Sequence, residues 1–206
     1  MKLRLTPLLL FGAALLAGPA AHAQFFGNDQ GGTVLPQGAI SSADAVTAFN
    51  PVIQNAEPTA VSLRPVSALG VPDHKAGEIC NLNVPCSAVS LGDGGSITLQ
   101  FVDNRLTGSG DNKSDLWIFE VGVDIEDTFV EISKDGVQWF AVGKVFGSTA
   151  GVDIDAFGFT VADLFAFVRL RDDPCWTRRS APAWAQTSMR GARSARWPSP
   201  SRAPGR

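Results

Sequence analysis

The feature that most constrains this chain is a series of apolar, β-favouring runs divided by short polar turns, over residues 115–142. DLWIFEV and TFVEIS are rich in Val, Ile, Phe and Trp, which pack well on a pleated sheet. Residues 129–132 alternate, with Phe and Glu on one face and Val and Ile on the other. Asp135 and Gly136 form the pair that favours a two-residue hairpin turn. We therefore predict an antiparallel meander inside an all-β fold.

Similar short runs recur along the chain and are separated by Gly, Asp and Pro, the spacing that is typical of a β-sandwich. A chain of 206 residues has room for one domain with a sizeable core. We expect a single sandwich over residues 41–174, preceded by a flexible Gly- and Gln-rich arm at 24–40. The runs expected to be strands are 43–50, 59–64, 96–102, 116–121, 128–133, 137–142 and 166–170, with one helical turn at 161–165.

The first 23 residues have the features of a secretory signal peptide. Lys2 and Arg4 precede a short apolar run, and Ala21 and Ala23 supply small residues before a cleavage point. A membrane anchor is the alternative, but the run is short for a span and contains Pro19. We expect the mature protein to be exported, to the periplasm, the cell surface or the extracellular space.

The charge of the expected mature body is strongly negative. Residues 24–174 carry 20 acidic side chains and eight basic ones. Nucleic acid and anionic lipid would both be repelled by such a body, so neither is an expected partner. The same acidity is compatible with divalent cations, or with simple solubility.

Export permits disulfides, and the chain has three cysteines. Cys80 and Cys86, in CNLNVPC, are expected to close a small loop, the alternative being two free thiols. Cys175 is left without a partner.

The composition changes abruptly after Pro174. Residues 175–206 contain no Val, Ile, Leu, Phe, Asp, Glu or Lys, yet hold three of the five tryptophans. A basic nucleic-acid-binding tail and a Pro/Arg-rich linker are two interpretations, but neither explains the frequent Trp. We favour a third, translation out of frame, and expect this disordered tail to lie outside the fold.

Several pieces of the chain, in this order, resemble a group of exported bacterial cell-surface proteins that often carry a C-terminal sorting signal. The pieces are ADAVTAFNP (43–51), ALGVPD (68–73), VSLGDGGSITLQF (89–101), SDLWIFEVG (114–122), VEISKDGVQW (130–139) and FVRLRDD (167–173). The order of strands also resembles the galactose-binding-like jelly roll of discoidin-type domains. The resemblance implies a jelly-roll sandwich that binds carbohydrate or another surface component through loops at one end. The closing strand and the sorting signal of such proteins have no counterpart in this chain.

Catalysis has little support in the sequence. His74 is the only histidine after the expected cleavage point, and no serine lies in a Gly-x-Ser-x-Gly elbow. The glycine-rich residues 92–95 precede a strand-like run, which favours a tight turn over a phosphate-binding loop.

Calcium is the sharper hypothesis, because hard cations bind several oxygens supplied by loops. The most favoured set lies in one polar loop: Asp103, Asn104, Asp111, Asn112 and Asp115. Two further acidic groups are Asp124, Glu126 and Asp127, and Asp153 with Asp155. The alternative is that these residues simply end strands and form turns.

Aromatic residues at strand positions are usually core, so only Trp139, just past the hairpin turn, is predicted as a surface platform for a ligand. Asp135 in the turn is its expected neighbour in a binding site. Glu120 lies inside an apolar run, where an unpaired carboxylate is costly, and Arg169 is the candidate partner. The alternative is that Glu120 points to solvent from an edge strand.

Together these observations favour an exported, non-enzymatic binding module for carbohydrate or another surface component, braced by calcium if a metal is bound. A self-associating matrix or surface-layer protein is the alternative, and an extracellular hydrolase ranks third.

Overall fold

The structure, a computed structural model, describes residues 22–28, 31–121 and 127–174. Strands dominate, and the helical segments within these ranges are three short 3-10 turns, so the predicted all-β class is confirmed. In the described part of the chain, no helix has the length and apolarity that a membrane span requires. Apart from residues 22 and 23, the expected signal peptide lies outside the described residues, as do Asp124, Glu126 and the expected tail with Cys175.

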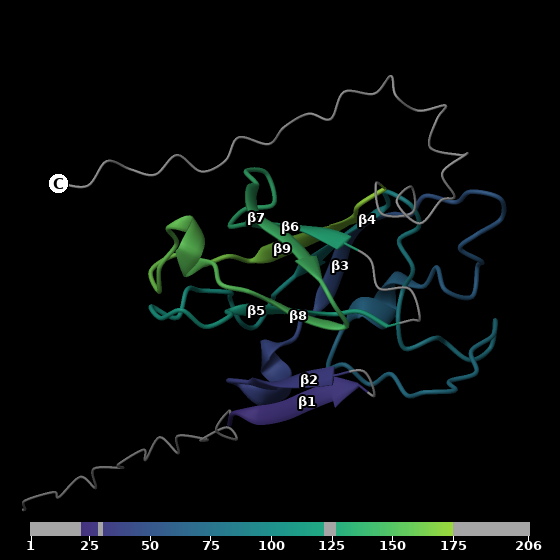
Figure 1. Cartoon of the computed structure of the whole chain (residues 1–206), viewed down its shortest axis with the longest axis horizontal. Coiled ribbons are helices and arrows are strands. Elements are labelled where there is room, and N and C mark those ends of the chain that lie inside the picture. The colour runs from purple at the N-terminus through teal and green to yellow at the C-terminus, as the bar shows by residue number, and fades with distance from the viewer. Residues whose placement is uncertain (1–21, 29–30, 122–126, 175–206) are drawn as a thin grey trace, which may run out of the picture.

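The larger layer is a five-stranded antiparallel sheet (Figure 1). Its order is β3 (Ala45–Asn50), β4 (Ser96–Gln100), β9 (Phe167–Asp172), β6 (Asp127–Ser133) and β7 (Phe140–Phe146). The last strand of the sequence therefore lies at the centre of the sheet, bonded to β4 on one side and β6 on the other. The predicted alternation in β6 is confirmed, since Val130 and Ile132 are fully buried.

A second, smaller layer consists of β5 (Leu116–Phe119) paired with β8 (Thr149–Val152). Leu116, Ile118 and Val152 from this layer enter the same hydrophobic cluster as the inward side chains of the large sheet, which makes the fold sandwich-like. Phe165, between the layers, is completely buried. Burying a side chain of this size contributes about 2–3 kcal/mol, so the space between the two layers is the main source of stability.

The segment expected to be a flexible arm contains a hairpin, β1 (Gln24–Asn28) with β2 (Gly31–Leu35). Leu35 is buried, and a Cβ added at Gly31 would lie 2.6 Å from Thr149 Oγ1, so β2 runs close to β8. The composition hid these strands because glycine is generally depleted in strands. Here the missing side chain is what permits the close approach.

Residues 51–95 connect β3 to β4 and contain no strand. The strand expected at 59–64 is wrong, because this stretch consists of turns; Ser62, for example, donates from its N–H to Thr59 O. Prolines at 58 and 65 bracket it and remove donors that a sheet would need. The 3-10 turns η1 (Gly38–Ser41) and η2 (Pro65–Ala68) lie before and within this part of the chain.

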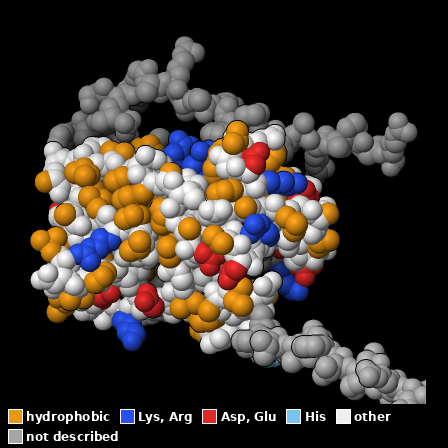
Figure 2. Space-filling model, turned by 180° about the vertical axis from the view of Figure 1, so that it is seen from behind, with side chains coloured by type: hydrophobic (Ala, Val, Ile, Leu, Met, Phe, Trp, Pro, Cys, Tyr) orange, Lys and Arg blue, Asp and Glu red, His pale blue; other side chains and the backbone are white. Residues whose placement is uncertain are grey.

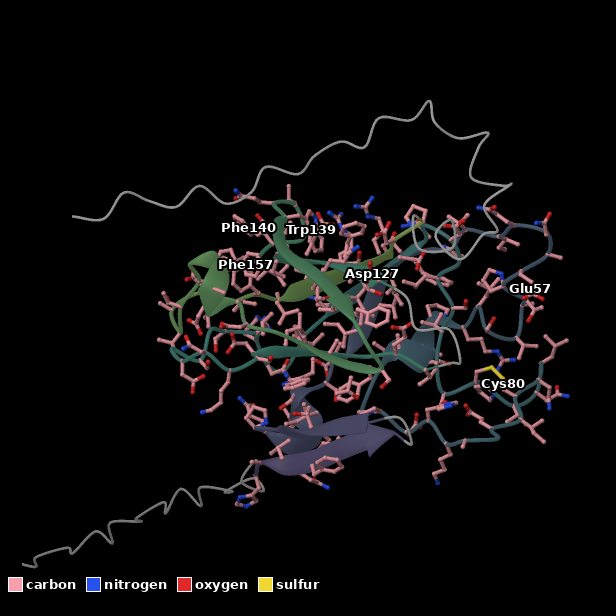
Figure 3. All side chains as sticks on the ribbon, viewed as in Figure 1. Glu57, Cys80, Asp127, Trp139, Phe140 and Phe157 are labelled. Carbon is pink, nitrogen blue, oxygen red and sulfur yellow. A yellow bond between two sulfur atoms is a disulfide. The ribbon has the colours of Figure 1, made fainter. Side chains whose placement is uncertain are left out.

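Two other expectations concern local structure. The helical turn predicted at 161–165 is a simple turn, in which Asp163 N–H donates to Thr160 O; the 3-10 turn η3 lies earlier, at Asp155–Phe157. The predicted disulfide is confirmed: Cys80 and Cys86 are joined, with Cα atoms 4.9 Å apart (Figure 3).

Candidate functional site

The hairpin between β6 and β7 is wider than predicted. Ile132 and Phe140 are the last paired residues, so seven residues (133–139) lie between them, and the prediction of a two-residue Asp-Gly turn is wrong. Gly136 has the expected positive φ of 76°, but Asp135 does not take a left-handed conformation. Instead, Asp135 Oδ1 accepts hydrogen bonds from the N–H groups of Val137 and Gln138, at 2.8 and 2.9 Å.

These hydrogen bonds give the Asp135 carboxylate a structural role in the loop. They stabilise its ionised form and hold its pKa below the ordinary value. Its Oδ1 also accepts from Ser133 Oγ. The carboxylate predicted to contact a ligand is thus engaged in shaping the loop.

The loop places Trp139 and Phe140 on opposite sides of the sheet. Phe140 turns inward and packs edge-to-face against Phe159 and Phe165, with ring centroids 5.3 and 6.2 Å apart. Trp139 stays half-buried, and its indole N–H donates to Gly136 O at 3.2 Å. Figure 3 shows the two residues together at the start of β7. Of the pair, only Trp139 is available on the outer face.

Trp139 is part of a row across the outer face of the five-stranded sheet. The guanidinium of Arg169 lies 4.2 Å from the centroid of the Trp139 ring, a cation–π stack. Arg169 Nε donates to Glu131 Oε2 at 2.7 Å, across the β6–β9 pair. Arg169 therefore pairs with Glu131 and not with Glu120, which corrects the partner expected from the sequence.

A second row lies two residues further along β9. The guanidinium of Arg171 lies 5.0 Å from the centroid of Phe129, and Lys144 Nζ lies 5.5 Å from the same ring. Lys144 is bonded to Asp127 and Asp173, and its pKa is raised, first by the hydrogen bond to the Asp127 carboxylate. This row therefore also combines cations with an aromatic ring.

Between the two rows the sheet has a shallow depression of about 360 Å³. It is lined by Ser96, Glu131, Arg169 and Arg171. A hydroxyl, a carboxylate and two guanidinium groups offer donors and acceptors side by side, with Trp139 stacked on one of the arginines. Such a combination suits a polyhydroxylated ring, whose hydroxyls both donate and accept.

The structure divides the predicted calcium loop into two parts. At one end, Asn104 Nδ2 donates to Ile40 O, and the N–H groups of Val102 and Asp103 face Asp44. The other end turns toward η3, where Asp155 accepts hydrogen bonds from the N–H groups of Ser109 and Gly110, each at 3.0 Å. No contact unites the five predicted residues in the described part of the chain.

The carboxylates that converge are Asp115, Asp153 and Asp155, all half-buried, each offering an oxygen within 4.8 Å of the others. Asp111 lies close by, because Ser109 Oγ donates to both Asp111 and Asp155. Within the described ranges no Lys or Arg pairs with the three. Backbone N–H groups, such as Ile154 N–H to Asp115, and the Ser109 hydroxyl donate to them. Three oxygens in loops next to strands are suitable ligands for a hard cation.

A second polar cluster joins His74, Glu78 and Ser87. His74 Nδ1 lies 3.1 Å from Glu78 Oε2 and 3.0 Å from Ser87 Oγ, and Ser87 also bonds directly to Glu78. In a Ser-His-acid triad the serine and the acid occupy opposite nitrogens of the imidazole. Here both contact the same nitrogen, so the cluster lacks the relay geometry of that mechanism.

The cluster borders a large cleft, about 1310 Å³, which lies between residues 51–95 and the inner sides of β4, β9 and β5. Its lining includes apolar side chains from all these elements, among them Leu91, Leu99 and Ile118. His74 and Glu78 lie with the long segment, and Asp111 and Asp115 belong to the loop before β5. No contact joins the two groups among the residues that the structure describes.

Sequence reasoning selected Trp139 but not Arg171, Phe129 or Ser96. The sequence does indicate that the two arginines are neighbours, because FVRLRDD alternates and places Arg169 and Arg171 on one face of a strand. What the alternation alone did not supply was the register that sets Phe129 and Ser96 opposite Arg171. Comparisons with family models, curated proteins and solved structures give no match to this chain.

Proposed function

We propose that the chain is an exported, non-enzymatic module that binds a saccharide or another cell-surface component on the outer face of its five-stranded sheet. The observation that supports this best is the row of Trp139, Arg169 and Glu131 beside the shallow depression. An aromatic ring next to paired polar groups is a common way to hold a sugar, since the ring packs on C–H groups while the polar groups bond the hydroxyls.

Binding of the full chain to a broad glycan array tests the proposal. Replacing Trp139 by Ala is expected to weaken binding about tenfold or more, because the anchor of the row is lost. Trp117→Ala is the matched control: Trp117 is also a half-buried tryptophan, but it belongs to β5 in the smaller layer. Equal losses in the two variants, or no glycan signal from the wild type, would contradict the proposal.

We further propose that Ca²⁺ bound by Asp115, Asp153 and Asp155 braces the loops around η3. Three carboxylates this close repel one another, so a cation that binds only the folded form raises stability with its concentration. The thermal midpoint is expected to rise with millimolar CaCl₂ and to fall with chelator. Asp153→Asn is expected to abolish the response and Asp103→Asn to preserve it. A response that Asp103 controls would instead favour the loop predicted from the sequence.

A structural, self-associating role is the second candidate, and β5 is the observation that favours it. Within the described sheets β5 pairs only with β8, and its other side borders the large cleft. An open edge can accept a strand from another chain. Sedimentation velocity over a hundredfold concentration range separates the two candidates: growing assemblies without glycan binding would favour the structural role.

A further inference from the structure

The outer face of β9 presents two arginines with different surroundings. Arg169 and Arg171 are separated by one residue, so both point to the same side of the central strand. Arg169 is opposite Glu131 on β6 and Thr98 on β4, whereas Arg171 is opposite Phe129 and Ser96. The neighbours of Arg171 thus include an aromatic ring and a hydroxyl but no carboxylate at the same level of the sheet.

The charge of Arg169 is compensated and that of Arg171 is not. Glu131, with its side chain only 19% exposed, bonds Arg169, and Lys144 on the same row as Arg171 is bonded to Asp127 and Asp173. Among the described residues, no carboxylate lies within ion-pair distance of Arg171. The guanidinium of Arg171 therefore keeps its fork of donors for a group from outside the chain.

Arg171 is also held in place before a ligand arrives. Its guanidinium stacks on Phe129, and the side chain as a whole is half-buried. A planar guanidinium that is already fixed loses little conformational freedom when it binds. Its natural complement is a carboxylate, which it can bind through two parallel hydrogen bonds.

The surroundings specify the rest of the ligand. Ser96 and Glu131 line the same depression as Arg171, and they can exchange hydrogen bonds with the hydroxyl groups of a ligand bound there. A volume of about 360 Å³ is at the lower end of the range for small-ligand sites, which fits one or two sugar units.

The acidic body limits how much negative charge the ligand can carry. With 20 acidic against eight basic side chains over residues 24–174, a long polyanion would meet repulsion beyond its contact with the arginines. A single carboxylate seated on Arg171 avoids this, because charges further away than about 8–10 Å are largely screened at physiological salt.

Building on the proposed function, we propose that the depression between Arg169 and Arg171 is a subsite for a terminal sugar bearing one carboxylate, such as a uronic acid. The carboxylate binds Arg171, the ring hydroxyls bind Ser96 and Glu131, and the Trp139–Arg169 stack forms the wall beside Glu131.

The test uses calorimetry on the full chain with three probes: a trisaccharide ending in glucuronic acid, its carboxyl-reduced counterpart, and a long polyuronate. The acidic trisaccharide is expected to bind at least about tenfold more tightly than the reduced one, the effect of losing one charge-assisted bidentate contact. Per binding site, the polyuronate is expected to bind no more tightly than the trisaccharide. This comparison of ligands needs no variant, so it does not depend on any variant folding.

Variants then assign the contact to a residue. Arg171→Gln is expected to remove the preference for the acidic trisaccharide, leaving the two trisaccharides within about twofold of each other. Lys75→Gln is the matched control, because Lys75 is exposed, carries the same charge and lies in the long segment. It is expected to leave the preference unchanged.

The outcomes separate this inference from the proposed function. Equal binding of the acidic and reduced trisaccharides by the wild type would overturn the inference and leave the saccharide module standing. Binding to no probe and to no glycan on the array would overturn both. A preference that survives Arg171→Gln would also overturn the inference, since the carboxylate would then be bound elsewhere.

Discussion

Two regions of the molecule are held together by different kinds of interaction. The five-stranded sheet buries Ile97, Val130, Ile132 and Val168 against the smaller layer, and its central strand β9 pairs with β4 and β6 in an unbroken register. Residues 51–95 form no strand, and local bonds hold them: one disulfide and a cluster around Glu78. The sheet thus depends mainly on burial. The segment packs only a few residues, such as Leu69 and Leu91, against the core, and it adds bonds that redox conditions and pH can change.

The exposed side chains show the same contrast. The long segment leaves Ile53, Val66, Ile79, Leu82 and Val84 about half exposed or more. Figure 2, the view from behind, shows apolar atoms gathered at the left, the side on which the long segment lies in that view. The large cleft also runs along this segment, so the contact between the segment and the core is incomplete. We conclude that most of the segment opens more easily than the sheet. Its last residues are tied to the sheet, since Gly94 N–H donates to the Asp172 carboxylate and Asp172 N–H donates to Gly95 O.

The largest effect is expected from the core of the sheet. Ile132→Ala is predicted to lower the free energy of unfolding by about 3–4 kcal/mol, because Ile132 is fully buried and truncation leaves a cavity. Ile53→Ala is the matched control in the long segment, where the side chain is 55% exposed, and is predicted to cost under about 0.5 kcal/mol. Urea unfolding followed by tryptophan fluorescence measures both. Similar losses would remove the contrast between the two regions.

A smaller, local effect is expected from the disulfide. Replacing Cys80 and Cys86 together by Ser should destabilise the long segment by about 2 kcal/mol, the entropy that a short closed loop saves. Hydrogen exchange is expected to speed up in residues 51–95 while amides in β4 and β9 remain protected. Glycan binding should also be retained. Loss of protection in β9 would mean that the two regions unfold as one unit.

The smallest effect is expected from pH. The pKa of Glu78 lies below its ordinary value of 4.5, chiefly because the Ser87 hydroxyl donates to the carboxylate, with His74 adding a further bond. A lowered folded-state pKa stabilises the segment at pH values above 4.5, and this contribution is lost as the pH falls through the folded-state value. Limited proteolysis of the segment should therefore accelerate as the pH falls below 4.5. In Glu78→Gln this part of the pH dependence is expected to disappear; an unchanged profile would exclude Glu78 as its source.

The sequence predicted the sheet better than the connections. β4, β6 and β9 alternate because one face is buried, and that requirement is visible in the residues themselves. β2 and β8 contain glycines where the two strands approach closely, as at Gly31 beside Thr149. Their sequences therefore lack the alternation of polar and apolar residues that predicts a strand. The hairpin turn was misjudged because Ser133 and Asp135 bond the backbone and stabilise a wider loop than Asp-Gly alone requires.

The candidate site was predictable only in part. The position of Trp139 beside a turn predicts a surface aromatic residue. Its partner Arg169 lies 30 residues later in β9, and only the pairing of β9 with β6 brings the two side chains together. The acidic residues show the same limit. The sequence predicts a metal site in which Asp115 joins its sequence neighbours, whereas the fold brings Asp115 to Asp153 and Asp155 because β5 and β8 pair. Proximity in sequence is a poor guide wherever antiparallel strands bring distant loops together.

The central place of β9 governs the order of assembly during synthesis. The pairs β3–β4 and β6–β7 can form as they emerge, but neither can join the other until Phe167–Asp172 has left the ribosome and inserted between them. Until then the β3–β4 and β6–β7 pairs each have an unpaired strand edge, and such edges can associate with the wrong strand or with another chain. A nascent chain shortened to end before Phe167 should therefore show no slowly exchanging amides in β4 or β6.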